Sequence, residues 1–124
     1  MQNMVTWFEI PVSDMDRAKT FYESVFKIEI SVQDFGGTIM GLFPFTEGKA
    51  GASGSLIKND AYQASETHGP LIYFGSDDVS NEIDRISEAG GQVLKAKTQI
   101  SPDVGFMGVF LDTEGNRIAL HSRQ

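Results

Sequence analysis

Residues 5–26 read VTWFEIPVSDMDRAKTFYESVF, and this stretch decides the fold. Its first part, 5–12, is rich in β-branched and aromatic residues, which is typical of a strand. Ser13 or Asp14 then ends the strand, because either side chain accepts a backbone N–H bond at the start of a helix. Apolar residues follow at helical spacing and share one face: Met15, Ala18, Phe21, Tyr22, Val25 and Phe26. The stretch predicts a strand that leads almost directly into an amphipathic helix.

Residues 71–91 repeat this layout. The segment 71–74 reads LIYF, Asp77 or Asp78 follows as a helix cap, and Gly90-Gly91 ends the helical pattern. Three strand-like segments come after each helix: 27–32, 38–43 and 53–58 in the first half, and 92–100, 105–111 and 117–121 in the second. A turn is expected at 33–37 and another at 112–116. The order βαβββ therefore occurs twice, which predicts an α+β fold made by duplication of one unit.

Length and composition narrow the class of protein. A chain of 124 residues is the size of one domain, so we predict a single domain over 1–124, with module one at about 1–58 and module two at about 71–124. The chain has no cysteine, which excludes disulfides and cysteine metal sites and is compatible with a cytoplasmic location. A net charge of −7 argues against nucleic acid or an anionic membrane as partner. The apolar runs are also too short to span a membrane.

Three segments resemble the vicinal oxygen chelate superfamily, which includes glyoxalase, bleomycin-resistance proteins, fosfomycin-resistance enzymes and extradiol dioxygenases. They are VSDMDRAKTFYESVF at 12–26, LIYFGSDDVSNEIDRI at 71–86 and FLDTEGNRIAL at 110–120. In this order they are spread over residues 12–120. The resemblance implies two βαβββ modules that form a curled mixed sheet around a cavity, commonly in a homodimer.

The resemblance also implies where a metal centre would lie. The family's first-strand histidine falls on Trp7, the opening residue of its second module on Leu71, and its late glutamate on Ala119. The fourth ligand comes from the strand that closes module one, and 51–57 contains no His, Asp, Glu or Gln. Indole, isobutyl and methyl groups cannot coordinate a divalent cation. The resemblance therefore implies a member with no metal ligand and no cofactor, whose cavity binds a small molecule, as in the bleomycin-binding proteins.

Four residues are candidates for this cavity. Glu9 lies two residues from Trp7 and shares its face of the strand, so it is a candidate for ligand binding or for general-base catalysis; the alternative is a solvated carboxylate near a strand end. His121 stands in the same relation to Ala119, and its alternative is an ordinary polar residue near a strand end. Tyr73 shares the face of Leu71. Large aromatics such as Trp7 and Tyr73 also often simply fill a protein interior.

Three functions follow from these residues. The first is a metal-independent small-molecule-binding protein of the bleomycin-resistance branch, with Trp7, Glu9, Tyr73 and His121 as ligand-binding residues. The alternative is a glyoxalase-like lyase or isomerase, or a dioxygenase, with a rearranged metal site or with Glu9 as the catalytic base. The third is an interaction module whose cavity is filled. His68 precedes Gly69-Pro70 and is expected to be an exposed loop residue.

Overall fold

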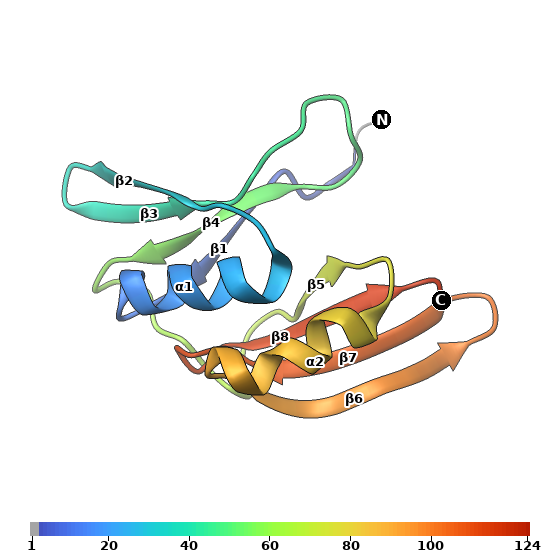
Figure 1. Cartoon of the computed structure of the whole chain (residues 1–124). Coiled ribbons are helices and arrows are strands. Elements are labelled where there is room, and N and C mark those ends of the chain that lie inside the picture. Colours follow the sequence, from blue (N-terminus) through green and yellow to red (C-terminus); the bar gives the residue numbers. More distant parts are fainter. Residues whose placement is uncertain (1–2) are drawn as a thin grey trace.

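The computed structural model describes residues 3–124 and contains two βαβββ modules (Figure 1). Module one consists of β1 (Trp7–Pro11), α1 (Met15–Phe26), β2 (Ser31–Phe35), β3 (Thr38–Leu42) and β4 (Ser53–Lys58). Module two consists of β5 (Ile72–Gly75), α2 (Val79–Ala89), β6 (Gln92–Ser101), β7 (Gly105–Leu111) and β8 (Arg117–Ser122). The predicted α+β class with two copies of one unit is confirmed.

Each module forms its own mixed sheet. The strand orders are β1-β4-β3-β2 and β5-β8-β7-β6, so the two sheets follow the same plan. The strand before each helix pairs in parallel with the strand that closes its module, β1 with β4 and β5 with β8. The remaining pairs are antiparallel.

Each helix begins after a capping aspartate and ends at a residue with positive φ. Asp14 accepts the Arg17 N–H at 3.0 Å and caps α1, and Asp78 accepts the Ser80 N–H at 3.0 Å and caps α2. The helices end at residues in the left-handed conformation, Lys27 with φ 56° and Gly90 with φ 105°.

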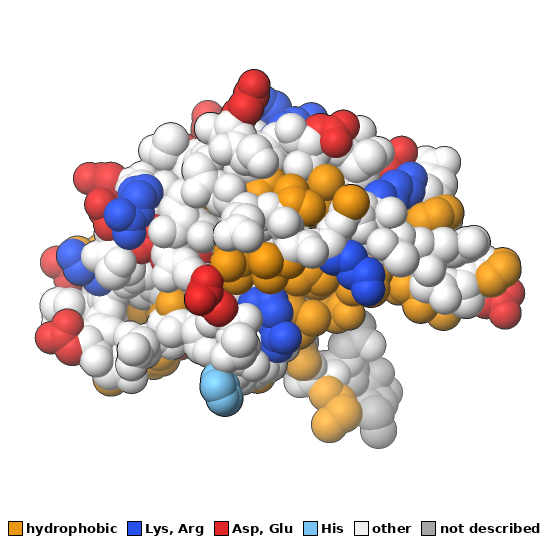
Figure 2. Space-filling model, turned by 90° about the horizontal axis from the view of Figure 1, so that it is seen from below, with side chains coloured by type: hydrophobic (Ala, Val, Ile, Leu, Met, Phe, Trp, Pro, Cys, Tyr) orange, Lys and Arg blue, Asp and Glu red, His pale blue; other side chains and the backbone are white. Residues whose placement is uncertain are grey.

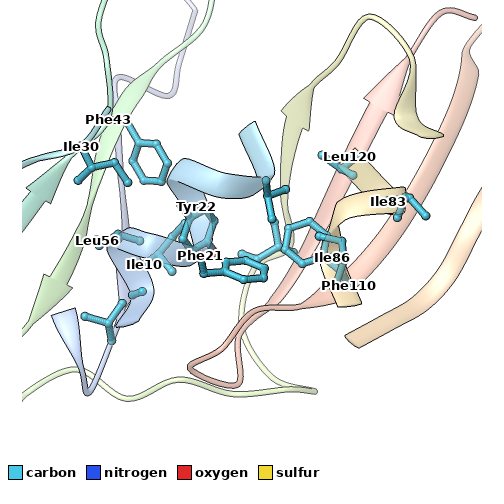
Figure 3. Packing of buried hydrophobic residues seen from close by; sticks show 14 of the residues in the cluster. Ile10, Phe21, Tyr22, Ile30, Phe43, Leu56, Ile83, Ile86, Phe110 and Leu120 are labelled. Carbon is cyan, nitrogen blue, oxygen red and sulfur yellow. The ribbon is translucent and has the colours of Figure 1, made fainter. Parts of the chain in front are cut away.

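One hydrophobic core joins the two modules. Each helix packs on one face of its own sheet, and the two helices also contact each other (Figures 1 and 3). Phe21 of α1 reaches into module two, where its ring centroid lies 5.9 Å from that of Phe110 in β7. Both side chains are almost fully buried, and a single cluster of buried residues contains members of both modules.

The first hairpin differs from its prediction. The sequence predicted a strand at 27–32 and a turn at 33–37, and both predictions were wrong. The chain leaves α1 through Lys27, and β2 begins only at Ser31. The turn is the pair Gly36-Gly37, with φ of 68° and 99°, and the Gly37 N–H donates to the Asp34 carboxylate at 2.8 Å. Two residues with positive φ match the twist of a tight hairpin, so the neighbouring Asp34 and Phe35 remain in the strand.

The face of each sheet away from its helix is open. Side chains alternate along a strand, so Ile10 packs into the core while Trp7 and Glu9 point to the opposite face. In β8, Ile118 and Leu120 are core residues, and Ala119 and His121 occupy the other face. Among residues 3–124, no helix is long and apolar enough to cross a membrane.

Candidate functional site

Trp7 and Glu9 lie side by side on the open face of the first sheet. The indole Nε1–H of Trp7 donates to Oε2 of Glu9 at 3.4 Å, and 45% of the Trp7 surface is exposed. The expectation that these two side chains share a face is confirmed. Trp7 is therefore not a core residue, and it offers an aromatic surface beside a carboxylate.

Ser55 is the member of this face that sequence reasoning missed. It lies in β4, in register with Glu9 on one side and Leu42 on the other. Its side chain is fully buried, and its hydroxyl oxygen has no hydrogen-bond partner among residues 3–124. A buried hydroxyl without a partner costs about 1–3 kcal/mol, so such groups are rare in folded proteins. The alternation of the strand after Ser53 was the signal that could have placed Ser55 on this face.

A hollow of about 380 Å³ adjoins Trp7. It is lined by Thr6, Trp7, Leu42, Phe43, Phe45 and Ser53. Phe45 is also largely exposed, at 66% of its surface, so two aromatic side chains border this hollow from outside the core. Aromatic and aliphatic walls beside a few polar groups are the usual composition of a small-molecule site.

Tyr73 and His121 lie on the open face of the second sheet. Tyr73 is half exposed and is the neighbour of Ala119 in the β5–β8 register. The Nε2–H of His121 donates to the Val104 carbonyl at 2.6 Å, which leaves Nδ1 as the accepting nitrogen of the neutral ring. Neither residue lines the hollow at Trp7 or the cavity that Glu9 borders. A single chain therefore does not bring the four candidates together.

The residues at the metal positions implied by the resemblance do not fit a metal. The β4 residue in register with Trp7 is Ser53, and the β5 residue in register with Ala119 is Tyr73. Over residues 3–124, no group of three or more His, Cys, Asp or Glu side chains is close enough to hold an ion. The donor set that the chemistry of a divalent cation requires is missing from these positions.

The turn at 112–116 has a second role that the sequence did not reveal. The Glu114 carboxylate accepts hydrogen bonds from the Ser13 and Asp14 N–H groups at 2.8 and 2.9 Å, and from Arg17 Nε at 2.7 Å. Burial alone would raise the pKa of Glu114, but the hydrogen bonds from Arg17, Asp14 and Ser13 outweigh it and lower the pKa to about 2. Module two thus caps the first helix of module one.

Two further residues of this turn, Asp112 and Asn116, also bind module one. We call the set of Asp112, Glu114 and Asn116 the inter-module clamp. The Asp112 carboxylate accepts the Tyr22 hydroxyl at 2.7 Å, and the Asn116 amide donates to the Pro11 carbonyl at 2.7 Å. Burial raises the pKa of Asp112, although the hydrogen bonds from Asn116 and Tyr22 oppose it. Burial and the nearby Asp112 charge raise the pKa of Tyr22 well above its usual range. These residues hold the modules together and leave the open faces free.

Comparisons with known proteins agree with this architecture. The family model of the Glyoxalase/Bleomycin resistance protein/Dioxygenase superfamily matches residues 4–120. A glyoxylase-like domain-containing protein from Didymella fabae is 26% identical over 128 residues, which are 99% of this chain and 96% of that protein.

Solved structures share the fold. TnmS3, an antibiotic binding protein from Streptomyces sp. CB03234, has a TM-score of 0.67 at 24% identity, with 98% of this chain and 97% of that chain covered. A glyoxalase I mutant from Zea mays has a TM-score of 0.74 at 16% identity over 95% of this chain, which spans only 46% of the maize protein. At these identities the likeness establishes the fold alone.

Proposed function

Because this chain belongs to the Glyoxalase/Bleomycin resistance protein/Dioxygenase superfamily, we propose that it is a metal-independent small-molecule-binding protein of the bleomycin-resistance branch. TnmS3 shares this fold and is an antibiotic binding protein, which supports this choice within the superfamily. The side chains at the metal positions support it as well, since indole and methyl groups cannot act as ligands. We place the protein in the cytoplasm, where a chain without cysteine has no need of an oxidising compartment.

The observation that carries the proposal is the hollow at Trp7, whose wall contains the exposed aromatic side chains of Trp7 and Phe45. Glu9 offers a charged acceptor on the same face, and Trp7 and Phe45 offer flat apolar surfaces for stacking. This set suits a ligand with an aromatic or conjugated part and at least one hydrogen-bonding group.

We further propose that the site is completed in a homodimer. The open faces carry large side chains that are about half exposed, Trp7 at 45% and Tyr73 at 50%. Figure 2 shows the molecule from below the view of Figure 1. On the side shown, hydrophobic side chains form a band across the middle, with charged side chains around it. A second copy that laid its β5–β8 face over β1 and β4 would bring Tyr73 and His121 to the ligand. Light scattering should give twice the mass of one chain, and a monomer at all concentrations would contradict this arrangement.

The binding test uses the single tryptophan of the chain as its probe. Bleomycin titrated into the protein should quench Trp7 emission saturably and raise the melting temperature, because a ligand that binds only the folded state stabilises it. The absence of both effects would contradict membership in the bleomycin-resistance branch.

The Ser55→Ala variant tests whether Ser55, which is buried and lines neither cavity in a single chain, takes part in binding. Without ligand it should be about 1 kcal/mol more stable than the wild type, because it removes a buried hydroxyl that has no partner. It should bind bleomycin about tenfold more weakly, which corresponds to the loss of one hydrogen bond of about 1.4 kcal/mol. Ser24→Ala is the matched control, since Ser24 is exposed on α1, and it should change neither quantity. Unchanged affinity in Ser55→Ala would remove Ser55 from the site.

A further inference from the structure

A second cavity lies at the seam between the modules, apart from the hollow at Trp7. It has a volume of about 230 Å³ and forms where the connector 59–70 passes the ends of β1, β5 and β8. Its polar lining consists of Glu9, Gln63, Ser65, His68, Asn116 and Arg117, of which Asn116 already donates to the Pro11 carbonyl. We call this space the seam cavity. The connector has no strand or helix of its own.

Arg117 is distinct among the four arginines of the chain. Arg17 donates to Glu114, Arg85 to the Val25 carbonyl, and Arg123 to the Asp103 carbonyl. Within residues 3–124, Arg117 makes no comparable hydrogen bond or ion pair. An uncommitted guanidinium that lines a cavity is a strong site for a carboxylate, because its donors match both carboxylate oxygens.

Glu9 brings the opposite charge to the seam cavity. Among residues 3–124, its carboxylate accepts one weak hydrogen bond, from the Trp7 indole at 3.4 Å, and no cation lies within ion-pair distance. Glu9 and Arg117 therefore line one cavity without pairing with each other. A cavity with separated opposite charges is complementary to a ligand that carries both charges itself.

His68 is held in place at the rim by its neighbours. The Ser65 hydroxyl oxygen accepts the His68 N–H at 2.8 Å, and the ring Nδ1 lies 2.8 Å from the Thr67 hydroxyl. This leaves Nε2 without a partner among the described residues. The side chain is exposed, as the sequence predicted, yet it also contributes to the wall of the seam cavity.

We propose that the seam cavity binds a small free α-amino acid as its zwitterion, with the carboxylate on Arg117 and His68 and the ammonium group on Glu9. The volume is below the 300–1,000 Å³ typical of sites for drug-sized ligands, so it suits a molecule with a short side chain. A simple anion would be repelled by Glu9, and a simple cation by Arg117. The zwitterion satisfies both charges. This site shares Glu9 with the face at Trp7, but it also requires Arg117 and His68, which do not line the hollow at Trp7.

The test is a titration of ¹⁵N-labelled protein with L-alanine and L-serine, followed by NMR. Saturable shifts are expected for amides in the connector and at the start of β8, with a Kd on the order of 1 mM. Propionate lacks the ammonium group and ethylamine lacks the carboxylate, so each should bind at least tenfold more weakly. Equal binding of propionate and alanine, or no saturable shift with either amino acid, would overturn the proposal.

Single substitutions test whether Arg117 binds the carboxylate of the amino acid and Glu9 its ammonium group. Arg117→Gln and Glu9→Gln should each weaken alanine binding at least tenfold. Arg123→Gln removes the same charge from an exposed arginine outside the seam cavity and should leave the binding unchanged. Equal weakening in Arg117→Gln and Arg123→Gln would show a general charge effect and refute the site. Bleomycin titration of Arg117→Gln separates the two proposals, because the face at Trp7 is intact in this variant.

Discussion

Replacing Glu114 with Gln should weaken the inter-module clamp in a pH-dependent way. The carboxylate accepts two backbone N–H groups and the Arg17 guanidinium, and these bonds lower its pKa from 4.5 to about 2. At about 1.4 kcal/mol per pKa unit, this difference corresponds to about 3 kcal/mol. Half of the Arg17 side chain is exposed, so solvent screening reduces the expected loss to about 2 kcal/mol.

The sign follows from the lowered pKa. The folded state holds the Glu114 proton less tightly than the unfolded state, so the stabilisation is complete above pH 4.5 and is lost as the pH falls towards 2. Glu114→Gln should therefore be about 2 kcal/mol less stable than the wild type at pH 7, and the difference should shrink between pH 4.5 and pH 2.

Urea unfolding followed by circular dichroism, repeated from pH 7 to pH 2.5, measures this difference. Glu88→Gln is the control, because Glu88 is exposed on α2 and has no part in the clamp. Equal stability of Glu114→Gln and wild type at pH 7 would refute the clamp. A loss that stays constant with pH would refute the role of the carboxylate charge.

Three further predictions concern the core, a close approach of strands and the metal. Tyr22→Phe should destabilise the protein by about 1–2 kcal/mol in urea unfolding, because buried Asp112 loses a donor at 2.7 Å; an unchanged midpoint would contradict this. Gly54→Ala should cost at least about 2 kcal/mol, because a Cβ there would overlap the Phe8 carbonyl and ring, whereas Gly75→Ala has open space and should be nearly neutral in the same assay. Protein exposed to Zn²⁺, Mn²⁺, Ni²⁺ and Fe²⁺ and then desalted should retain far less than one ion per chain by elemental analysis, and stoichiometric metal would contradict the proposed function.

Local features of the sequence were sufficient to predict both helices and the shared face of Trp7 and Glu9. The caps Asp14 and Asp78 act within three residues of themselves, and side-chain alternation in β1 depends only on the strand. Helix caps and side-chain alternation can therefore be predicted without knowing which distant residues pack nearby. The first hairpin was misplaced because Lys27 adopts a left-handed conformation that its residue type does not favour.

Long-range contacts were not predictable in this way. Glu114 reads as a turn residue, but its partner Ser13 lies 101 residues earlier in the chain. Ser55 reads as an ordinary strand serine, and its burial depends on which side chains of β1 and β3 lie beside it. The roles of Trp7, Glu9, Tyr73 and His121 in ligand binding remain predictions, because a single chain leaves them on two separate faces.

The cap that Glu114 provides has a consequence for synthesis on the ribosome. The Asp14 amide emerges 100 residues before the carboxylate that accepts its hydrogen bond. At about 5–20 residues per second, this interval lasts about 5 to 20 seconds. Only in the first part of that interval does β1 lack its parallel partner β4, which begins at Ser53. Until Glu114 emerges, Asp14 can already cap α1 through the Arg17 N–H, but the Ser13 and Asp14 N–H groups must be satisfied by water.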